Sequence, residues 1–201
     1  MNCPKKVAIL IYDEVELLDF CGPYEVFSIT GKRDNIHPFK VYTVSEKAEP
    51  NLTSNKLSIN PHYVFSDCPD PDILVIPGGL GSRREMHNSV VLDWVVCAAQ
   101  NAELVLSVCT GALILARAGL LKGLSATTHH NAINLLREIA PDTTVYDDKR
   151  FIDNGKIILS AGISAGIDMS FYVLAKLLGE KQAQETAYHM EYDWKPEFKA
   201  P

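Results

Sequence analysis

The chain contains 201 residues, of which 47% are hydrophobic and 22% are charged. That length and balance suit one globular domain with a full core, and they exclude a disordered chain and a small disulfide scaffold. Lys and Arg total 19 while Asp and Glu total 25, so the net charge is −6. An acidic chain lacks the excess of positive charge that contacts with phosphate backbones require, so we expect no nucleic-acid partner.

Membrane segments and cysteine-based frameworks are also excluded by the sequence. No apolar run reaches the roughly 20 residues that cross a bilayer, so no membrane partner is expected. The five cysteines are an odd number without a C-x-x-C pair, which is typical neither of a disulfide framework nor of a zinc site. Residues 7–12 follow two lysines, but this run is short and lacks the cleavage site of a signal peptide. We therefore expect a cytoplasmic protein without a bound metal.

Short apolar runs recur along the chain and predict strands. Continuous runs at residues 7–12, 73–76 and 104–106 are typical of strands buried on both faces. Residues 150–159 predict two strands joined by an Asn-Gly turn. Further strands are expected at residues 39–44, 57–59 and 125–128, while the polar residues 45–55 are expected to form a loop.

Helical patterns lie between these strands. Gly22 and Pro23 suit the first turn of a helix that ends at Gly31, and Asn88 is suited to cap the next helix. Helices are also expected at residues 113–121, 131–140 and 167–178. Apolar strands that alternate with helices predict an α/β fold, with a mainly parallel sheet covered by helices on both faces.

The predicted sheet indicates where the chemistry should lie. In parallel α/β sheets, ligands bind beyond the carboxyl ends of the strands. We therefore expect a site just after Tyr12, Ile76 and Val108. No linker or internal repeat divides the sequence, so a single domain spanning residues 1–201 is expected.

Cys109 lies between an apolar strand and a helix, with Ser107 two residues before it and Gly111 two residues after it. This is the spacing of a nucleophile elbow, a turn so tight that only small residues fit at those two positions. A thiol there is expected to be exposed at the edge of the sheet. The amides of the following helix are expected to lower its pKa and so favour the reactive thiolate. The alternative hypothesis is a small buried residue at the end of a strand.

Asp19 lies among apolar residues just beyond the first predicted strand. Poor solvation there would raise the pKa of its carboxyl, so that Asp19 could give and take protons beside a thiolate. The alternative is that Asp19 caps the helix opened by Gly22 and Pro23, although it stands one or two residues too early for an ordinary N-cap. Both hypotheses remain open at the level of sequence.

Two further features follow strands at the same edge of the sheet. Gly78 and Gly79 either let the backbone approach a ligand and present amides as an oxyanion site, or form only a turn. His129 either orients or deprotonates the thiol, or lies at the surface or caps a helix. The other histidines are scattered and show no metal-ligand spacing.

Five separated motifs, in this order, resemble the ThiJ/PfpI superfamily, which has the class I glutamine amidotransferase-like fold. They are LDFCGPYEVF (18–27), IPGG (76–79), SVCTG (107–111), ATTH (126–129) and AGISAGID (161–168). The resemblance covers nearly the whole chain and implies a flavodoxin-like three-layer sandwich with a nucleophile-elbow cysteine. Within the superfamily, the motifs are most similar to the isocyanide hydratase branch and to the ligand-binding halves of related transcription regulators.

The resemblance implies roles for the candidate residues. Cys109 would be the nucleophile that attacks the terminal carbon of an isocyanide, and Asp19 would move protons. Thr110 would help to hold the water that completes an N-substituted formamide, and the amides of Gly78 or Gly79 would complete the pocket. The family is typically dimeric and uses no cofactor, so the resemblance implies a homodimer that acts on a small molecule.

One departure from the family pattern and two alternative functions accompany this resemblance. Ile163, on the loop before the last long helix, would pack near Cys109. Intracellular-protease members of the superfamily carry a histidine directly after the nucleophile, where this chain has Thr110, so protease or amidase activity would need His129 instead. The alternatives to a hydratase are a non-catalytic ligand-binding or redox-sensing protein with a reversibly oxidised Cys109, and a cysteine hydrolase of small amides or glyoxal-type adducts.

Overall fold

Seven strands form one sheet at the centre of the computed structural model, within the residues that it describes, 3–196. Their order is β10-β11-β7-β6-β1-β2-β5, and every neighbouring pair is parallel except β10 with β11. The mainly parallel sheet predicted from the sequence is thereby confirmed. Its strands are β1 (Lys5–Leu10), β2 (Phe39–Ser45), β5 (Tyr63–Val64), β6 (Ile73–Ile76), β7 (Leu104–Val108), β10 (Phe151–Asp153) and β11 (Ile157–Ser160).

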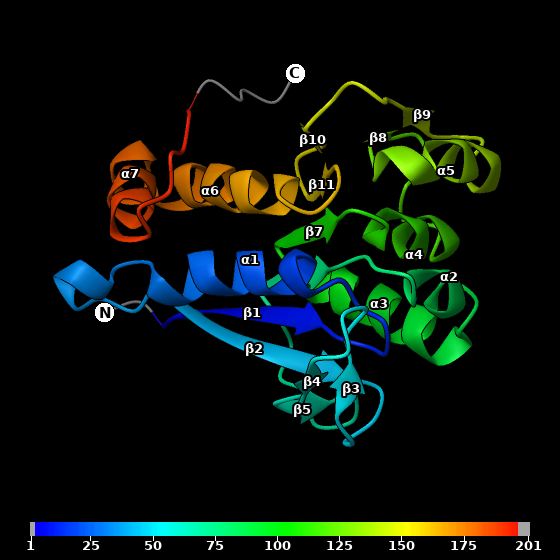
Figure 1. Ribbon diagram of the computed structural model, residues 1–201, viewed down its shortest axis with the longest axis horizontal. Coiled ribbons are helices and arrows are strands. Elements are labelled where there is room, and N and C mark those ends of the chain that lie inside the picture. The colour runs from blue at the N-terminus through cyan, green and yellow to red at the C-terminus, as the bar shows by residue number, and fades with distance from the viewer. Residues whose placement is uncertain (1–2, 197–201) are drawn as a thin grey trace.

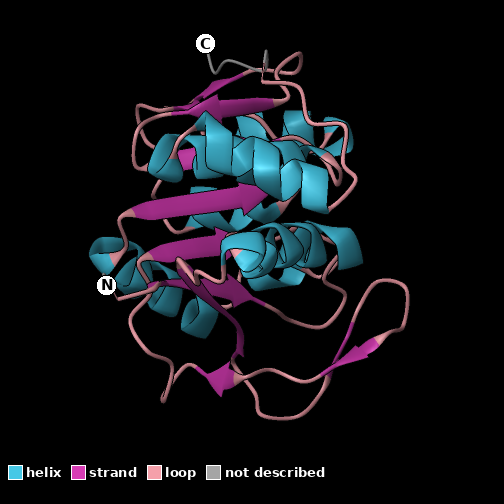
Figure 2. Cartoon of the chain, turned by 90° about the vertical axis from the view of Figure 1, so that its left-hand side faces the viewer, coloured by secondary structure: helices cyan, strands magenta, loops and turns pink. Residues whose placement is uncertain are grey.

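Helices cover both faces of this sheet. α1 and α6 pack side by side, α1 on β2 and α6 on β7 and β11, as Figure 1 shows. α4 lies on β6 and β7, and α3 packs against α4. In Figure 2 the strands pass through the middle of the molecule, with helices in front of them and behind them. The α-helices are α1 (Leu17–Ile29), α2 (Ser82–Glu85), α3 (Ser89–Asn101), α4 (Gly111–Arg117), α5 (Ile133–Ile139), α6 (Ala165–Leu178) and α7 (Glu180–His189), with 3-10 turns at Lys32–Asp34 and His130–Ala132.

The continuous apolar runs form the buried centre of the sheet, as predicted. Every residue of β6 and β7 is buried, and so are the last four residues of β1. The register places Ile76 beside Ser107 and Ser160 beside Val108. The segments that follow β6, β7 and β11 therefore leave the sheet at one common edge.

The first helix begins earlier than the sequence predicted. α1 starts at Leu17, so Gly22 and Pro23 lie inside it instead of opening it. Gly22 faces α6, where a Cβ atom would lie 2.8 Å from Ile167 Cγ1. Close packing of α1 on α6 thus outweighs the local tendency of Gly and Pro to stand at a helix start.

Smaller differences from the predictions lie in the connections. The segment expected as a loop contains β3 (Asn51–Leu52), which pairs with β4 (Ser58–Ile59). The strand expected at residues 125–128 shortens to β8 (Ser125–Ala126), which pairs with β9 (Thr144–Val145) outside the main sheet. α4 ends at Arg117, earlier than expected. Neither α2 nor α7 was predicted, because α2 has only four residues and α7 has few apolar ones.

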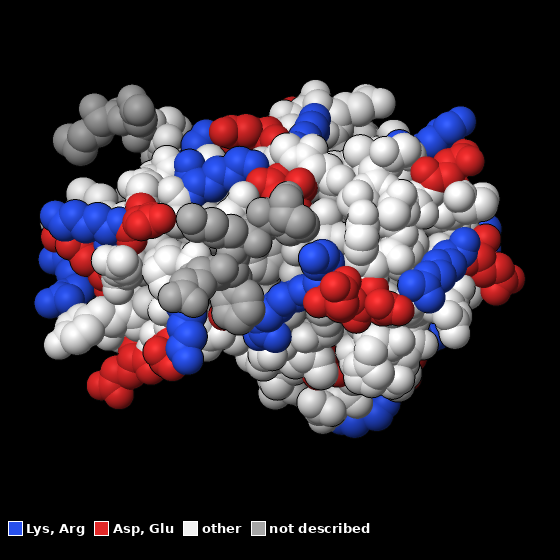
Figure 3. All heavy atoms as spheres, turned by 90° about the horizontal axis from the view of Figure 1, so that it is seen from above, with Lys and Arg blue, Asp and Glu red and all other residues white. Residues whose placement is uncertain are grey.

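The surface carries charges of both signs. On the face shown in Figure 3, Lys and Arg side chains lie in small groups interspersed with Asp and Glu. That face therefore presents no continuous basic tract among the described residues of the kind that binds phosphate backbones. Within the same described part of the chain, no helix is both long enough and apolar enough to cross a bilayer.

Gly166 sets the distance between α6 and β7, because a Cβ atom there would lie 2.7 Å from Val108 Cγ1. We predict that Gly166→Ala lowers the free energy of unfolding by about 1–3 kcal/mol through overpacking. Val108→Ala removes the clashing methyl groups, so Gly166→Ala should destabilise that variant less than the wild type. Urea unfolding of all four proteins in a double-mutant cycle measures this coupling, and strictly additive effects would contradict close packing at Gly166.

Candidate active site

Cys109 occupies the sharp turn between β7 and α4 that the sequence predicted. Its backbone is left-handed, with φ +57°, a conformation that is uncommon outside glycine. Hydrogen bonds hold the turn on both sides: the Cys109 amide donates to the carbonyl oxygens of Ser160 (3.2 Å) and Ala161 (3.1 Å), and Thr128 Oγ1 donates to the Cys109 carbonyl (2.7 Å). A Cβ atom on Gly111 would lie 2.0 Å from the Ile76 carbonyl oxygen, which explains the small residue two positions after the cysteine.

Asp19 lies in the first turn of α1 and is fully buried. Its Oδ2 accepts a hydrogen bond from the Gly78 amide at 3.0 Å. Its Oδ1 is also buried and has no hydrogen-bond partner among the described residues. The helix N-cap is Glu16 and receives no side-chain capping bond, so the hypothesis that Asp19 caps this helix is wrong. Because α1 begins early, Asp19 is directed toward β6 and Cys109 instead.

Burial gives Asp19 an unusually basic carboxyl, as the sequence suggested. Desolvation raises its pKa to about 7, although the Gly78 amide and the interaction with Cys109 partly offset the rise. The pKa of Cys109 is also raised, to about 12, by burial and by the negative charge of Asp19. The amides of Thr110 and Ile163 lower the thiol pKa, but by less than burial and Asp19 raise it.

The prediction that Cys109 is an exposed thiol with a lowered pKa was therefore wrong. Cys109 is only 5% exposed, so it loses solvation that the amides of Thr110 and Ile163 replace only in part. Two neighbouring acidic groups titrate as a pair, and the pair keeps one proton over a wide pH range. Moving that proton from the thiol to Asp19 removes the carboxylate charge that opposes the thiolate. The arrangement is thus suited to proton transfer between the two residues.

Ile163 lies beside both Asp19 and Cys109. Its backbone φ is +50°, a genuine outlier for a β-branched residue. Its amide lies where it lowers the pKa of both Asp19 and Cys109. The side chain is 37% exposed and lines the cavity over Cys109, so the expected position of Ile163 near the thiol holds. The left-handed turn directs one amide toward two acidic groups.

Gly78 and Gly79 approach the site through their backbones, but their amides are already in use. The Gly78 amide holds Asp19, and the Gly79 amide donates to Thr110 Oγ1 at 3.0 Å. Thr110 Oγ1 also accepts from Ser82 Oγ at 2.8 Å and donates to the Gly79 carbonyl at 3.2 Å. The Gly78 and Gly79 amides and the Thr110 hydroxyl therefore hold Asp19 and the turn at Cys109 in place. The two amides are not free to bind an oxyanion, and the hydroxyl is not free to bind water.

Ser82 was not singled out from the sequence. It lies in the four-residue helix α2, which is too short to show a periodic pattern. Its side chain is fully buried and holds both Thr110 Oγ1 and the Gly79 carbonyl, the latter at 2.7 Å. Only the fold shows that Ser82 supports the site.

His129 lines the cavity over Cys109. The cavity over Cys109 has a volume of about 170 Å³, and the residues that line it are Glu16, Gly79, Leu80, Arg83, Cys109, Thr110, His129, Asn131 and Ile163. His129 Nδ1 accepts a hydrogen bond from the Asn131 amide at 3.2 Å, so the ring also caps the following 3-10 turn. Burial, together with His130 and Arg83, lowers its pKa and favours a neutral imidazole. No three His, Cys, Asp or Glu side chains gather as a metal site among residues 3–196.

The sequence model of the DJ-1/PfpI family matches residues 5–176, a stretch that includes Asp19, Cys109 and Ile163. The chain belongs to the DJ-1/PfpI family. It is 33% identical over 193 residues to the isonitrile hydratase of Pseudomonas putida, covering 96% of this chain and 81% of that protein. It is also 33% identical over 201 residues to Protein DJ-1alpha of Drosophila melanogaster, covering 97% of this chain and 88% of that protein.

A solved DJ-1/PfpI structure supports the same architecture. The crystal structure of a ThiJ/PfpI family protein from Pseudomonas syringae matches with a TM-score of 0.85 and 28% identity, covering 96% of this chain and 77% of that chain. The flavodoxin-like α/β fold implied by the motifs is therefore confirmed. The resemblance to this family noted from five sequence motifs is confirmed as well.

The raised pKa of Asp19 makes the stability of this DJ-1/PfpI protein depend on pH. A carboxyl whose pKa is 3.8 in ordinary surroundings and about 7 in the fold stabilises the folded state when protonated. That contribution is complete below the unfolded pKa and is lost as pH rises through about 7. We predict that Asp19→Asn raises the free energy of unfolding at about pH 8 by up to roughly 4 kcal/mol, with little gain near pH 3.

Denaturant unfolding at both pH values measures this effect. Glu25→Gln, an exposed substitution on the same helix, is the matched control and should change little. A large loss of stability in Asp19→Asn at both pH values would instead assign Asp19 a purely structural role.

Proposed function

We propose that this DJ-1/PfpI protein is a cofactor-independent hydratase that converts small isocyanides to N-substituted formamides through a covalent intermediate on Cys109. The observation that carries the proposal is the buried pair in which an Asp19 carboxyl of pKa about 7 faces the Cys109 thiol. The 33% identity to an isonitrile hydratase over 96% of this chain supports the same class of reaction.

In the first step, the Cys109 sulfur bonds to the terminal carbon of R–N≡C. Asp19 accepts the thiol proton and passes it to that carbon, so the product is the thioimidate Cys109–S–CH=N–R. A soft sulfur nucleophile suits this uncharged electrophilic carbon. A carboxyl whose pKa lies near neutrality both accepts and donates the proton efficiently.

In the second step, water adds to the thioimidate carbon. Asp19 takes one proton from the water and delivers it to nitrogen, which leaves S–CH(OH)–NH–R. The C–S bond then breaks, the hydroxyl proton returns to sulfur through Asp19, and R–NH–CHO departs. Asp19 Oδ1, buried and unpartnered among the described residues, is the acceptor we assign to the attacking water. The thiol and the carboxyl both end in their starting states.

The surrounding residues position this pair and limit the substrate. Thr110, Gly78 and Gly79 act by fixing the turn and the Asp19 carboxyl, while the Ile163 amide faces the reacting sulfur. The cavity of about 170 Å³ is smaller than the roughly 300–1,000 Å³ of typical drug-sized pockets, which favours a small R group.

A cysteine hydrolase of small amides or glyoxal-type adducts is supported less well. It would need His129 as its base, but His129 Nδ1 accepts the Asn131 amide, so the neutral ring carries its proton on Nε2 and neither nitrogen is free to accept the thiol proton. Cys109 has Asp19 beside it for that proton instead.

The proposed enzyme acts on a small molecule in the cytoplasm as a homodimer. The five cysteines are free thiols, which suits a reducing compartment.

The hydratase proposal predicts that the protein converts an aryl isocyanide to the corresponding formamide. Chromatography of the reaction mixture measures the formamide that is formed. Cys109→Ala should abolish turnover, and Asp19→Asn should lower kcat by about 100-fold or more, because the proton carrier is lost. The singly protonated pair is the active form, so kcat/KM should fall about tenfold per pH unit below about 7.

Cys97→Ala, which alters an exposed thiol on α3, is the control and should retain full turnover. Equal formamide production by wild type and Cys109→Ala would overturn the proposal.

A second candidate function is redox sensing through Cys109. The amides of Thr110 and Ile163 that face the sulfur support it, because they would stabilise a sulfinate, and Asp19 would accept the proton that the thiol must lose before it is oxidised. This hypothesis predicts that dilute hydrogen peroxide adds oxygen to the Cys109 peptide before the peptides of the exposed Cys3 and Cys97, measured by peptide mass spectrometry. Preferential oxidation of the exposed thiols would count against it.

A further inference from the structure

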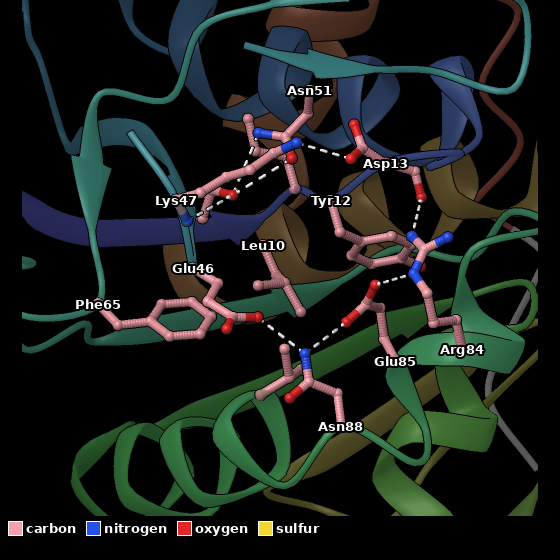
Figure 4. Close-up of a pocket in the computed structure, with 13 residues that line it drawn as sticks. Leu10, Tyr12, Asp13, Glu46, Lys47, Asn51, Phe65, Arg84, Glu85 and Asn88 are labelled. Atoms are coloured by element: carbon pink, nitrogen blue, oxygen red, sulfur yellow. Dashed lines mark hydrogen bonds and ion pairs between the residues drawn. The ribbon is translucent and has the colours of Figure 1, made fainter. Parts of the chain in front are cut away.

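A second cavity lies at the carboxyl ends of β1 and β2. Its volume is about 360 Å³, within the roughly 300–1,000 Å³ of small-molecule sites. Figure 4 shows the side chains around it, which come from the ends of both strands, from α2 and from the N-terminus of α3. It shares no lining residue with the cavity over Cys109, so it is a separate compartment.

The charges that line this cavity leave an excess of carboxylate. Asp13, Glu46 and Glu85 oppose only Lys47 and Arg84. Both cations are already engaged: Lys47 pairs with Asp13 at 2.6 Å, and Arg84 pairs with Glu85 at 2.8 Å. Glu46 is exposed and forms no ion pair with a described Lys or Arg.

Two of these carboxylates converge on one point. Asn88 Nδ2 donates to Glu46 Oε2 at 2.7 Å and to Glu85 Oε2 at 3.0 Å, as the dashed lines in Figure 4 show. Glu85 is buried and its other oxygen is held by Arg84, so Oε2 is fixed in direction. An ammonium group placed near Asn88 Nδ2 can therefore donate to the carboxylates of both Glu46 and Glu85.

One side of the cavity is apolar. Leu10, Phe65 and Val91 line it, and because Leu10 and Val91 are buried, the partly exposed Phe65 supplies the apolar surface that a ligand can reach. The Phe65 ring is stacked on Trp94 with centroids 4.5 Å apart, so its orientation is fixed. An apolar wall beside a pair of carboxylates matches a ligand with one charged end and one hydrophobic end.

We propose that this cavity binds a small organic cation, namely a protonated primary amine that carries a short apolar or aromatic group. The ammonium hydrogens donate to Glu46 and Glu85 beside the Asn88 amide, which stays in place as the N-cap of α3, and the apolar group lies against Phe65. The excess negative charge disfavours carboxylate ligands.

Isothermal titration of the full chain with benzylammonium chloride tests the proposal, with benzyl alcohol as the neutral probe of similar shape. We expect saturable binding of benzylammonium and none of benzyl alcohol at the same concentrations. Glu46→Gln should weaken benzylammonium binding about tenfold or more, because a charge-assisted hydrogen bond is lost. Glu49→Gln is the matched control, since Glu49 is exposed on the same loop but does not line the cavity.

A separate measurement distinguishes this cavity from the one over Cys109. Cys109→Ala should leave benzylammonium binding unchanged, because Cys109 does not line this cavity. Equal affinity in wild type and Glu46→Gln, equal affinity for benzyl alcohol, or loss of binding in Cys109→Ala would each overturn the proposal. Because Glu46 is exposed, Glu46→Gln is expected to fold normally, and a thermal unfolding curve checks this directly.

Discussion

The site depends on two acidic groups held together where water does not solvate them. Burial makes both the Asp19 carboxyl and the Cys109 thiol hold protons more tightly than they would in solvent. Both cannot be ionised at once at moderate pH, so a single proton is shared between carboxyl oxygen and sulfur. The Gly78 amide fixes one carboxylate oxygen and leaves the other without a partner among the described residues. Chemistry that needs a proton moved to and from sulfur fits this arrangement.

The backbone supplies the geometry at some cost in stability. Cys109, Gly79 and Ile163 all have positive φ, and for the two residues other than glycine such conformations cost about 1–3 kcal/mol each. Neighbouring elements hold these turns in place: the Cys109 amide donates to carbonyls at the end of β11, and Gly79 bridges to Val15. The central strands are buried and rigid, so they provide the support that strained turns at their ends require.

Much of this could be predicted from the sequence because local patterns encode it. Continuous apolar runs identified the central strands, and the small residues around Cys109 identified its sharp turn. The raised pKa of Asp19 also followed from its apolar neighbours. The direction of the thiol pKa shift could not be predicted, because it depends first on how deeply the fold buries Cys109 and then on a carboxyl that lies ninety residues earlier in the chain. The roles of Ser82 and of the Gly79 amide likewise depend on contacts between segments that no local pattern reports.

The close approach at Gly78 divides the site into a part that tolerates change and a part that does not. A Cβ atom there would lie 2.4 Å from the Thr110 amide nitrogen and 3.0 Å from Asp19 Oδ2, so the floor admits no side chain. The rim is different, because Leu80 is 64% exposed and Ile163 is 37% exposed. Substitutions at Leu80 and Ile163 can therefore change which ligands enter the cavity during evolution. The backbone at Gly78 and the Asp19–Cys109 pair beneath it must stay the same.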